Sequence, residues 1–150
     1  MDFSRYEPYE SLILRVFLGL TLIFWGYEKL ALPKLADTYI KDYQGFMIID
    51  VKLFLLIFGI AQIILGAMMI VGFYSRIPAA FLALMAIVTI IIPGMIILKD
   101  VPHFAYAFAT AGGAIALFIR GSGAYSLDAK RLKKQQFREK MAKERDRVSH

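Results

Sequence analysis

The sequence predicts an all-α membrane protein, a bundle of four transmembrane helices with a basic C-terminal tail. Its 150 residues are 59% hydrophobic, more than a soluble domain of this length needs. Most of the apolar residues lie in long runs, each close to the ~20 residues that cross a ~30 Å hydrocarbon layer as a helix. The fourth run is the shortest and reaches that length only with Pro102 and His103. The runs cover residues 12–32, 53–74, 77–98 and 104–119.

The net charge of +6 belongs entirely to the tail. Residues 1–128 carry nine basic and nine acidic residues, whereas residues 129–150 carry nine basic and three acidic ones. Because Lys and Arg concentrate on the cytoplasmic side of membrane proteins, we expect both termini to be cytoplasmic. Residues 1–128 are therefore predicted as a transmembrane domain and residues 129–150 as a cytoplasmic tail. Anionic lipids, rather than nucleic acid, are its expected partner, because the chain is held in a membrane; an acidic protein is the alternative.

The first run is expected to end before Pro33, whose nitrogen has no hydrogen to donate. The following loop repeats Leu35, Tyr39 and Tyr43 at four-residue spacing, which favours a short interfacial helix. Asp50 then suits the N-cap of the second span. No secretory signal peptide is indicated at the N-terminus.

Spans two and three are joined only by the short segment GFYSR, so we expect them to be antiparallel neighbours. Pro78 suits the first turn of the third span. Pro93 and Gly94 should bend that span, or locally open it, near its outer end.

One stripe of the first span combines two cations with two glycines. At ~3.6 residues per turn, Arg15, Gly19, Leu22, Gly26 and Lys29 share a face. Glycines allow close helix contact, so the stripe should point into the bundle, with the two cations near opposite ends. Snorkelling of Arg15 or Lys29 to the interface is the alternative.

Other polar side chains should also point inward. Gln62 shares a face with Gly59 and Gly66, and His103 lies near Tyr106 on the fourth span. Because lipid offers no hydrogen-bond partners, these groups must satisfy one another, water or a ligand. For Gln62, an interhelical hydrogen bond and a ligand contact are both open. For His103, a satisfied histidine at a helix start is the alternative.

Several classes of redox centre are excluded by composition. The chain has no Cys and only two His, His103 and His150. It therefore cannot by itself hold an iron–sulfur cluster or a bis-histidine haem, or run thiol chemistry, and no metal site is expected. Any redox centre must be a diffusing molecule or belong to a partner.

Three segments resemble the DoxX family of small four-helix membrane proteins: LRVFLGLTLIFWGYEKL, ILGAMMIVGFYSRIPA and GSGAYSLD. The family includes a subunit of thiosulfate:quinone oxidoreductase, so the resemblance implies a membrane oxidoreductase component that meets a non-covalently bound quinone. Many relatives carry an acidic residue in helix two where this chain has Gln62. The residues that match the family motif are Gly26, Lys29, Gly72, Arg76, Gly121, Gly123, Tyr125, Ser126, Leu127 and Asp128.

Two functions follow as hypotheses, and neither assigns a catalytic residue. The first is a quinone-interacting subunit, in which inward donors contact the quinone carbonyls. The second is a non-catalytic assembly or anchoring subunit, which packs its glycine faces against a larger membrane complex or a second copy of the chain. The predicted ligand-binding residues are Arg15, Lys29, Gln62, His103 and Tyr106.

Overall fold

A computed structural model describes residues 7–31, 37, 41, 50–97 and 104–148. The predicted all-α bundle with a basic tail is confirmed, and the described part of the chain contains no strand. Three helices are long and apolar enough to cross a membrane, and the fourth is a shorter apolar helix of 15 residues. The helices are α1 (Glu7–Ala31), α3 (Val51–Val71), α4 (Arg76–Thr89) with its π-helical continuation η2 (Ile90–Ile97), α5 (Tyr106–Arg120) and α6 (Leu127–Val148).

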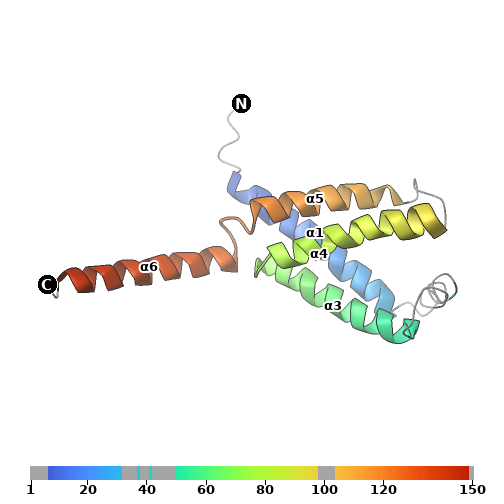
Figure 1. Ribbon diagram of the computed structural model, residues 1–150, viewed down its shortest axis with the longest axis horizontal. Helices are drawn as coiled ribbons and strands as arrows, with labels where there is room; N and C mark the ends of the chain where they lie inside the picture. Colours follow the sequence, from blue (N-terminus) through green and yellow to red (C-terminus); the bar gives the residue numbers. More distant parts are fainter. Residues whose placement is uncertain (1–6, 32–36, 38–40, 42–49, 98–103, 149–150) are drawn as a thin grey trace, which may run out of the picture.

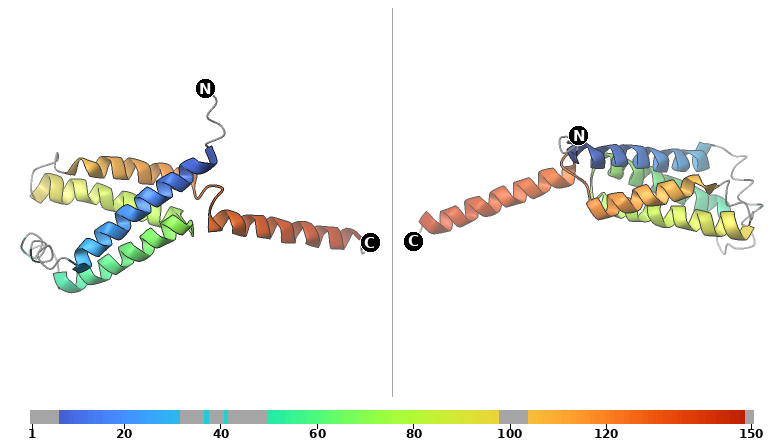
Figure 2. Two further views of the ribbon diagram at one scale, coloured as in Figure 1. Left: turned by 180° about the vertical axis from the view of Figure 1, so that it is seen from behind. Right: turned by 90° about the horizontal axis from the view of Figure 1, so that it is seen from above.

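The four bundle helices form two antiparallel hairpins. α1 packs mainly against α3, and α4 mainly against α5. Both hairpins meet near the start of α6, and their ribbons diverge toward the opposite end (Figure 2). We call the end near Ser11, Gly72 and Gly121 the tail end, and the opposite end, near Lys29 and Val51, the loop end.

Glycines bring α1 and α3 into backbone contact at two levels. A Cβ on Gly66 would lie 2.6 Å from the carbonyl oxygen of Gly19, and one on Gly26 would lie 2.6 Å from that of Gly59. Real Cβ atoms do not approach carbonyls so closely, so the hairpin requires glycine at these levels. The predicted inward stripe of α1 and the Gly59, Gln62 and Gly66 face of α3 are therefore confirmed as packing faces.

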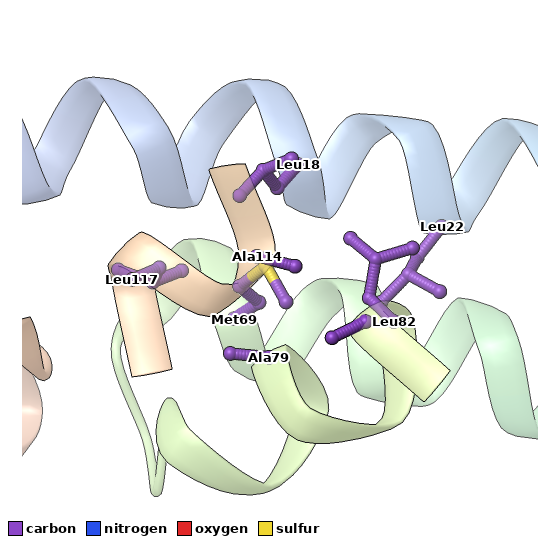
Figure 3. Close-up of a cluster of buried hydrophobic side chains, with 8 residues drawn as sticks. Leu18, Leu22, Met69, Ala79, Leu82, Ala114 and Leu117 are labelled. Carbon is purple, nitrogen blue, oxygen red and sulfur yellow. The ribbon is translucent and has the colours of Figure 1, made fainter. Parts of the chain in front are cut away.

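An apolar core joins the two hairpins toward the tail end (Figure 3). Short side chains such as Ala79 and Ala114 let α4 and α5 approach the leucines of α1. The core uses the apolar part of each helix face, and the polar residues lie above and below it. The labelled core residues are Leu18, Leu22, Met69, Ala79, Leu82, Ala114 and Leu117.

Several helix ends follow the sequence. Asp50 caps α3, with its Oδ1 accepting a hydrogen bond from the Lys52 amide at 2.9 Å. Gly72 ends α3 in the left-handed region at φ 77°, where glycine is favoured. The opening predicted around Pro93 and Gly94 is confirmed as the π-helical segment η2. The predicted end of the first helix is consistent with α1 ending at Ala31, whereas the helix predicted around Leu35, Tyr39 and Tyr43 lies outside the described residues.

The basic tail forms α6, a helix of 22 residues that leaves the tail end and runs away from the bundle (Figure 1). Its side chains are exposed over almost all of the described length. At ~1.5 Å per residue the helix is about 33 Å long. Most of its cations are therefore held well beyond the ends of the bundle helices.

Candidate functional site

Gln62 lies on α3 at the level where the two hairpins begin to part, and its side chain is fully buried at 0% exposure. Its Nε2 donates a weak hydrogen bond to the Met85 sulfur on α4 at 3.2 Å. Its Oε1 is buried and has no hydrogen-bond partner. An unpaired buried amide oxygen costs about 1 to 3 kcal/mol, and among the residues that the structure describes none supplies a partner for this atom.

Lys29 lies about one turn further toward the loop end, on α1. Its Nζ donates to the backbone carbonyl of Trp25 at 3.0 Å and lies 5.9 Å from the centre of the Phe58 ring. These contacts hold the ammonium against the bundle helices, so the snorkelling alternative does not describe this side chain. An ammonium has three hydrogens, and among the described residues only the Trp25 carbonyl accepts from this one.

Aromatic and sulfur-containing side chains from all four helices surround these two polar groups. Phe58 of α3 contacts Phe81 of α4, with ring centres 5.9 Å apart, and Trp25 of α1 meets Tyr106 of α5 edge-on at 6.1 Å. We call this set the polar layer. It consists of Trp25, Lys29, Phe58, Gln62, Phe81, Met85 and Tyr106.

Three of the five predicted site residues, Lys29, Gln62 and Tyr106, belong to the polar layer, and the Tyr106 ring is linked to it through Trp25. Tyr106 is 49% exposed, so its ring lies at the edge of the bundle and not in its centre. Thr110, one turn further along α5, donates back to the Tyr106 carbonyl at 3.0 Å and is used within its own helix. His103 lies outside the described residues.

Arg15 lies at the tail end and is not part of the polar layer. It is separated from Lys29 by 14 positions on α1, or about 21 Å along the helix. Its side chain is fully buried, with Nε donating to the Ser11 carbonyl at 3.3 Å and Nη2 to the Tyr125 carbonyl at 2.5 Å. The snorkelling alternative is wrong for Arg15, because the segment that follows α5 closes over the guanidinium.

Two glycines make this closure possible. A Cβ on Gly72 would lie 1.8 Å from Arg15 Nη1, and a Cβ on Gly123 would lie 2.6 Å from Cβ of Ser11. Both glycines also have positive φ, at 77° and 70°. We call this region the tail junction, and it consists of Ser11, Arg15, Gly72, Gly123, Tyr125, Ser126 and Asp128.

Asp128 ties the start of α6 to the turn between α3 and α4. Its Oδ1 accepts from the Tyr74 amide at 3.0 Å, and its Oδ2 accepts from the Ser122 hydroxyl at 2.5 Å and from the Ser75 amide at 3.4 Å. Burial raises the pKa of this carboxyl, but these hydrogen bonds and the charge of Arg131 outweigh it and leave the pKa below its usual range. The carboxylate also attracts the Arg15 guanidinium.

Ser126 caps α6, with Oγ accepting from the Ala129 amide at 3.0 Å. The segment GSGAYSLD is packed against the bundle, because Gly121 and Ser126 are buried and the Tyr125 ring stacks on Tyr9 at 5.3 Å. The residues of this motif therefore attach α6 to the bundle, and this structural role explains them.

The apolar residues that line the polar layer were not predicted from the sequence. Phe58, Phe81 and Met85 lie in uniformly apolar segments, where nothing distinguishes them from lipid-facing residues. Whether these side chains face lipid or the polar layer depends on which helices are neighbours, which the sequence does not display. Within the part of the chain that the structure describes, no group of acidic or histidine side chains could hold a metal ion.

A family model described as DoxX matches residues 11–95, which is more than half of the chain. The matched region contains most of α1, all of α3 and α4 and most of η2, and therefore Arg15, Lys29 and Gln62. No curated protein and no solved structure matched the chain.

Proposed function

The chain belongs to the DoxX family, and on this premise we propose that it is a quinone-binding component of a membrane oxidoreductase system, with the quinone held in the polar layer. Its multi-pass membrane character follows from the family and the apolar helices. The single observation that carries the proposal is the fully buried Gln62 with its unpaired Oε1.

The groups of the polar layer suit a quinone head group. The Lys29 ammonium can donate to one of the two carbonyls. The Gln62 carboxamide oxygen can accept from the hydroxyl of the reduced form, which alone has a hydrogen to donate to it, so Gln62 contributes to binding of the quinol. Phe58 and Phe81 offer apolar ring surfaces for the flat head group, and the exposed aliphatic faces of the helices suit an isoprenoid tail.

The electrons would come from another molecule. The chain has no cysteine, and the polar layer contains no group that itself cycles between redox states. We therefore assign the chain the binding and positioning of the quinone, and we assign the electron donor to a partner protein. Whether the chain is an enzyme subunit in the strict sense depends on that partner.

The tail end is assigned to the cytoplasm in this proposal. Arg76 and Arg120 lie at the tail end, together with the nine basic residues of residues 129–150, and the positive-inside rule then sets the orientation. Reporter fusions after Tyr43 should respond as external, and fusions after residue 150 as internal. An external C-terminal reporter would refute this orientation.

The alternative function is a non-catalytic assembly or anchoring subunit. Its main support from the sequence was the glycine faces, which were available to pack against a partner. Gly19, Gly26, Gly59 and Gly66 instead pack α1 against α3 within the chain. The alternative is therefore retained as an outcome of the experiment below and not as an equal conclusion.

The test compares Lys29→Met with Lys52→Met in the full chain. Both changes keep an unbranched side chain and remove one ammonium, but Lys52 is exposed on the first turn of α3. Losing a charge-assisted hydrogen bond should lower quinone affinity roughly ten- to a hundred-fold. Quinone is measured in the organic extract of each purified protein.

We expect bound quinone in the wild-type chain and in Lys52→Met, and little in Lys29→Met. Retention of the full amount by a folded Lys29→Met protein would refute the site. A wild-type chain that carries no quinone, and is recovered only inside a larger membrane complex, would favour the assembly subunit.

A further inference from the structure

Two guanidinium groups flank the turn between α3 and α4 at the tail end. Arg76 begins α4 and is exposed, and within the described residues it has no carboxylate in ion-pair contact. Its guanidinium lies against the backbone of Gly121, 3.6 Å from where a Cβ would be. Arg131 is exposed on the first turns of α6 and stacks over the Phe73 ring, with Cζ 4.6 Å from the ring centre.

The fold fixes these two groups relative to each other. Asp128 accepts hydrogen bonds from the amides of Tyr74 and Ser75, so the start of α6 is attached directly to the turn that precedes Arg76. The two oxygens of Asp128 already receive three hydrogen bonds, which leaves Arg131 with donors free to bind a further anion. One guanidinium thus directly follows the turn, and the other lies over the two aromatic rings within it.

Tyr74, in the same turn, is held in an unusual backbone conformation. Its φ is 47°, in the left-handed region that large side chains rarely occupy. Such a conformation costs about 1 to 3 kcal/mol and persists only where neighbouring contacts impose it. Here it leaves the Tyr74 ring 52% exposed beside Phe73 and under Arg131. An amphipathic ring at the end of a membrane helix suits the headgroup level.

The remaining cations of the tail are placed elsewhere. α6 runs away from the bundle (Figure 1), and the 17 residues after Arg131 extend about 25 Å further. That distance, which applies to the far end of the helix, is about three times the Debye length of about 8 Å at physiological salt. Arg138 and Lys140 lie seven and nine positions beyond Arg131, about 10 and 14 Å further along the helix, so their attraction to the headgroups of the same membrane is weaker than that of Arg131.

We propose that Arg76, Arg131 and Tyr74 form a binding site for the phosphate of an anionic phospholipid headgroup. The planar guanidinium forks can each bind a phosphate bidentately, and the Tyr74 ring lies at the boundary between headgroup and acyl chain. The apolar ends of α3 and α4 adjoin the site, which favours a phospholipid over a soluble phosphate. The lipid contact expected along the whole tail is thereby concentrated at the turn, and this inference is independent of the quinone site.

The full chain in neutral detergent is titrated with short-chain phosphatidylglycerol, and the rise in its unfolding temperature gives the apparent affinity. The test protein carries Arg76→Gln and Arg131→Gln. The matched control carries Arg138→Gln and Lys140→Gln, which remove the same charge from exposed positions further along α6. Glycerol phosphate, titrated alongside, provides the headgroup chemistry without acyl chains.

Removing each near-surface cation should weaken phosphatidylglycerol binding roughly fivefold, so the double variant at the turn should bind about 25-fold more weakly. The control should lose clearly less affinity than the double variant at the turn, and glycerol phosphate should produce no shift at the same concentrations. Equal losses in both double variants would overturn the site in favour of diffuse tail attraction. An equal shift with glycerol phosphate would overturn the lipid assignment.

If the double variant does not fold, Arg76→Gln alone decides the question, because Arg76 is exposed and forms no ion pair within the described residues. The expected fivefold loss supports the site. Unchanged affinity in the folded single variant refutes it.

Discussion

The tail junction and the polar layer each contain a fully buried polar side chain, but they differ in how many hydrogen bonds it forms with the rest of the chain. Arg15 in the tail junction donates to two backbone carbonyls and has the Asp128 carboxylate nearby, although its Nη1 has no hydrogen-bond partner. Gln62 in the polar layer has one weak bond to sulfur, and its oxygen has none. Because lipid provides no substitute partners, the first arrangement stabilises the fold, whereas the second is suited to receive a ligand.

The largest effect should come from Arg15→Leu. This change removes the donor from the Tyr125 carbonyl and takes a positive charge away from Asp128 in a buried setting. Breaking one partner of a buried charged contact typically costs about 3 to 5 kcal/mol. We expect the free energy of unfolding in detergent, measured by thermal or denaturant unfolding, to fall by this amount.

The control for Arg15 is Arg120→Leu. Arg120 also bridges two segments of the tail end, through an ion pair with Glu10, but both side chains are about half exposed. Exposed pairs contribute about 0 to 1 kcal/mol. If the two variants lose equal stability, burial is not what distinguishes Arg15, and the assignment of the tail junction as a structural unit fails.

A slightly smaller loss is expected from Gly72→Ala. The new Cβ would meet Arg15 Nη1 at 1.8 Å in a left-handed backbone conformation, so the guanidinium must move. Strain and displacement together should cost about 2 to 4 kcal/mol. Gly112→Ala provides the contrast, because a Cβ there meets nothing within 4 Å and should stabilise α5 by up to about 1 kcal/mol. Equal unfolding temperatures for the two variants would contradict the described packing.

The tail junction should also weaken in acid. The folded pKa of Asp128 is lowered, so its stabilising contribution is fully present above the unfolded pKa of about 3.9. It is lost as the pH falls through the lower folded value. The stability difference between the wild type and Asp128→Asn should therefore shrink as the pH is lowered below about 4. A difference that stays constant from pH 6 to pH 3 would show that ionisation of this carboxylate does not matter.

Local periodicity was sufficient to predict the helix faces. The stripe from Arg15 to Lys29 and the face around Gln62 follow from 3.6 residues per turn and from the rule that polar groups avoid lipid. The caps at Asp50 and Ser126 follow from residue type at a helix start. These features depend on neighbours within four residues, which a sequence displays directly.

Contacts between distant segments could not be predicted in the same way. The tail junction joins Arg15 to Gly72 and Tyr125, which are far apart in the chain, and no periodicity indicates that pairing. The inward direction predicted for Tyr106 was only partly right, because α5 contacts α1 along a face that leaves the ring half exposed. Both the contacts of Arg15 and the exposure of Tyr106 depend on which segments pack next to each other in the fold.

The most direct test of the contrast is Gln62→Leu. Leucine has a similar volume and removes the unpaired oxygen, so the apo protein should be as stable as the wild type or slightly more stable. The extractable quinone should fall about tenfold. Unfolding temperature and quinone content are measured on the same purified preparations. Unchanged stability with little bound quinone is the predicted result, whereas a loss of about 1 to 3 kcal/mol with full quinone content would show that Gln62 supports the fold and does not bind the ligand.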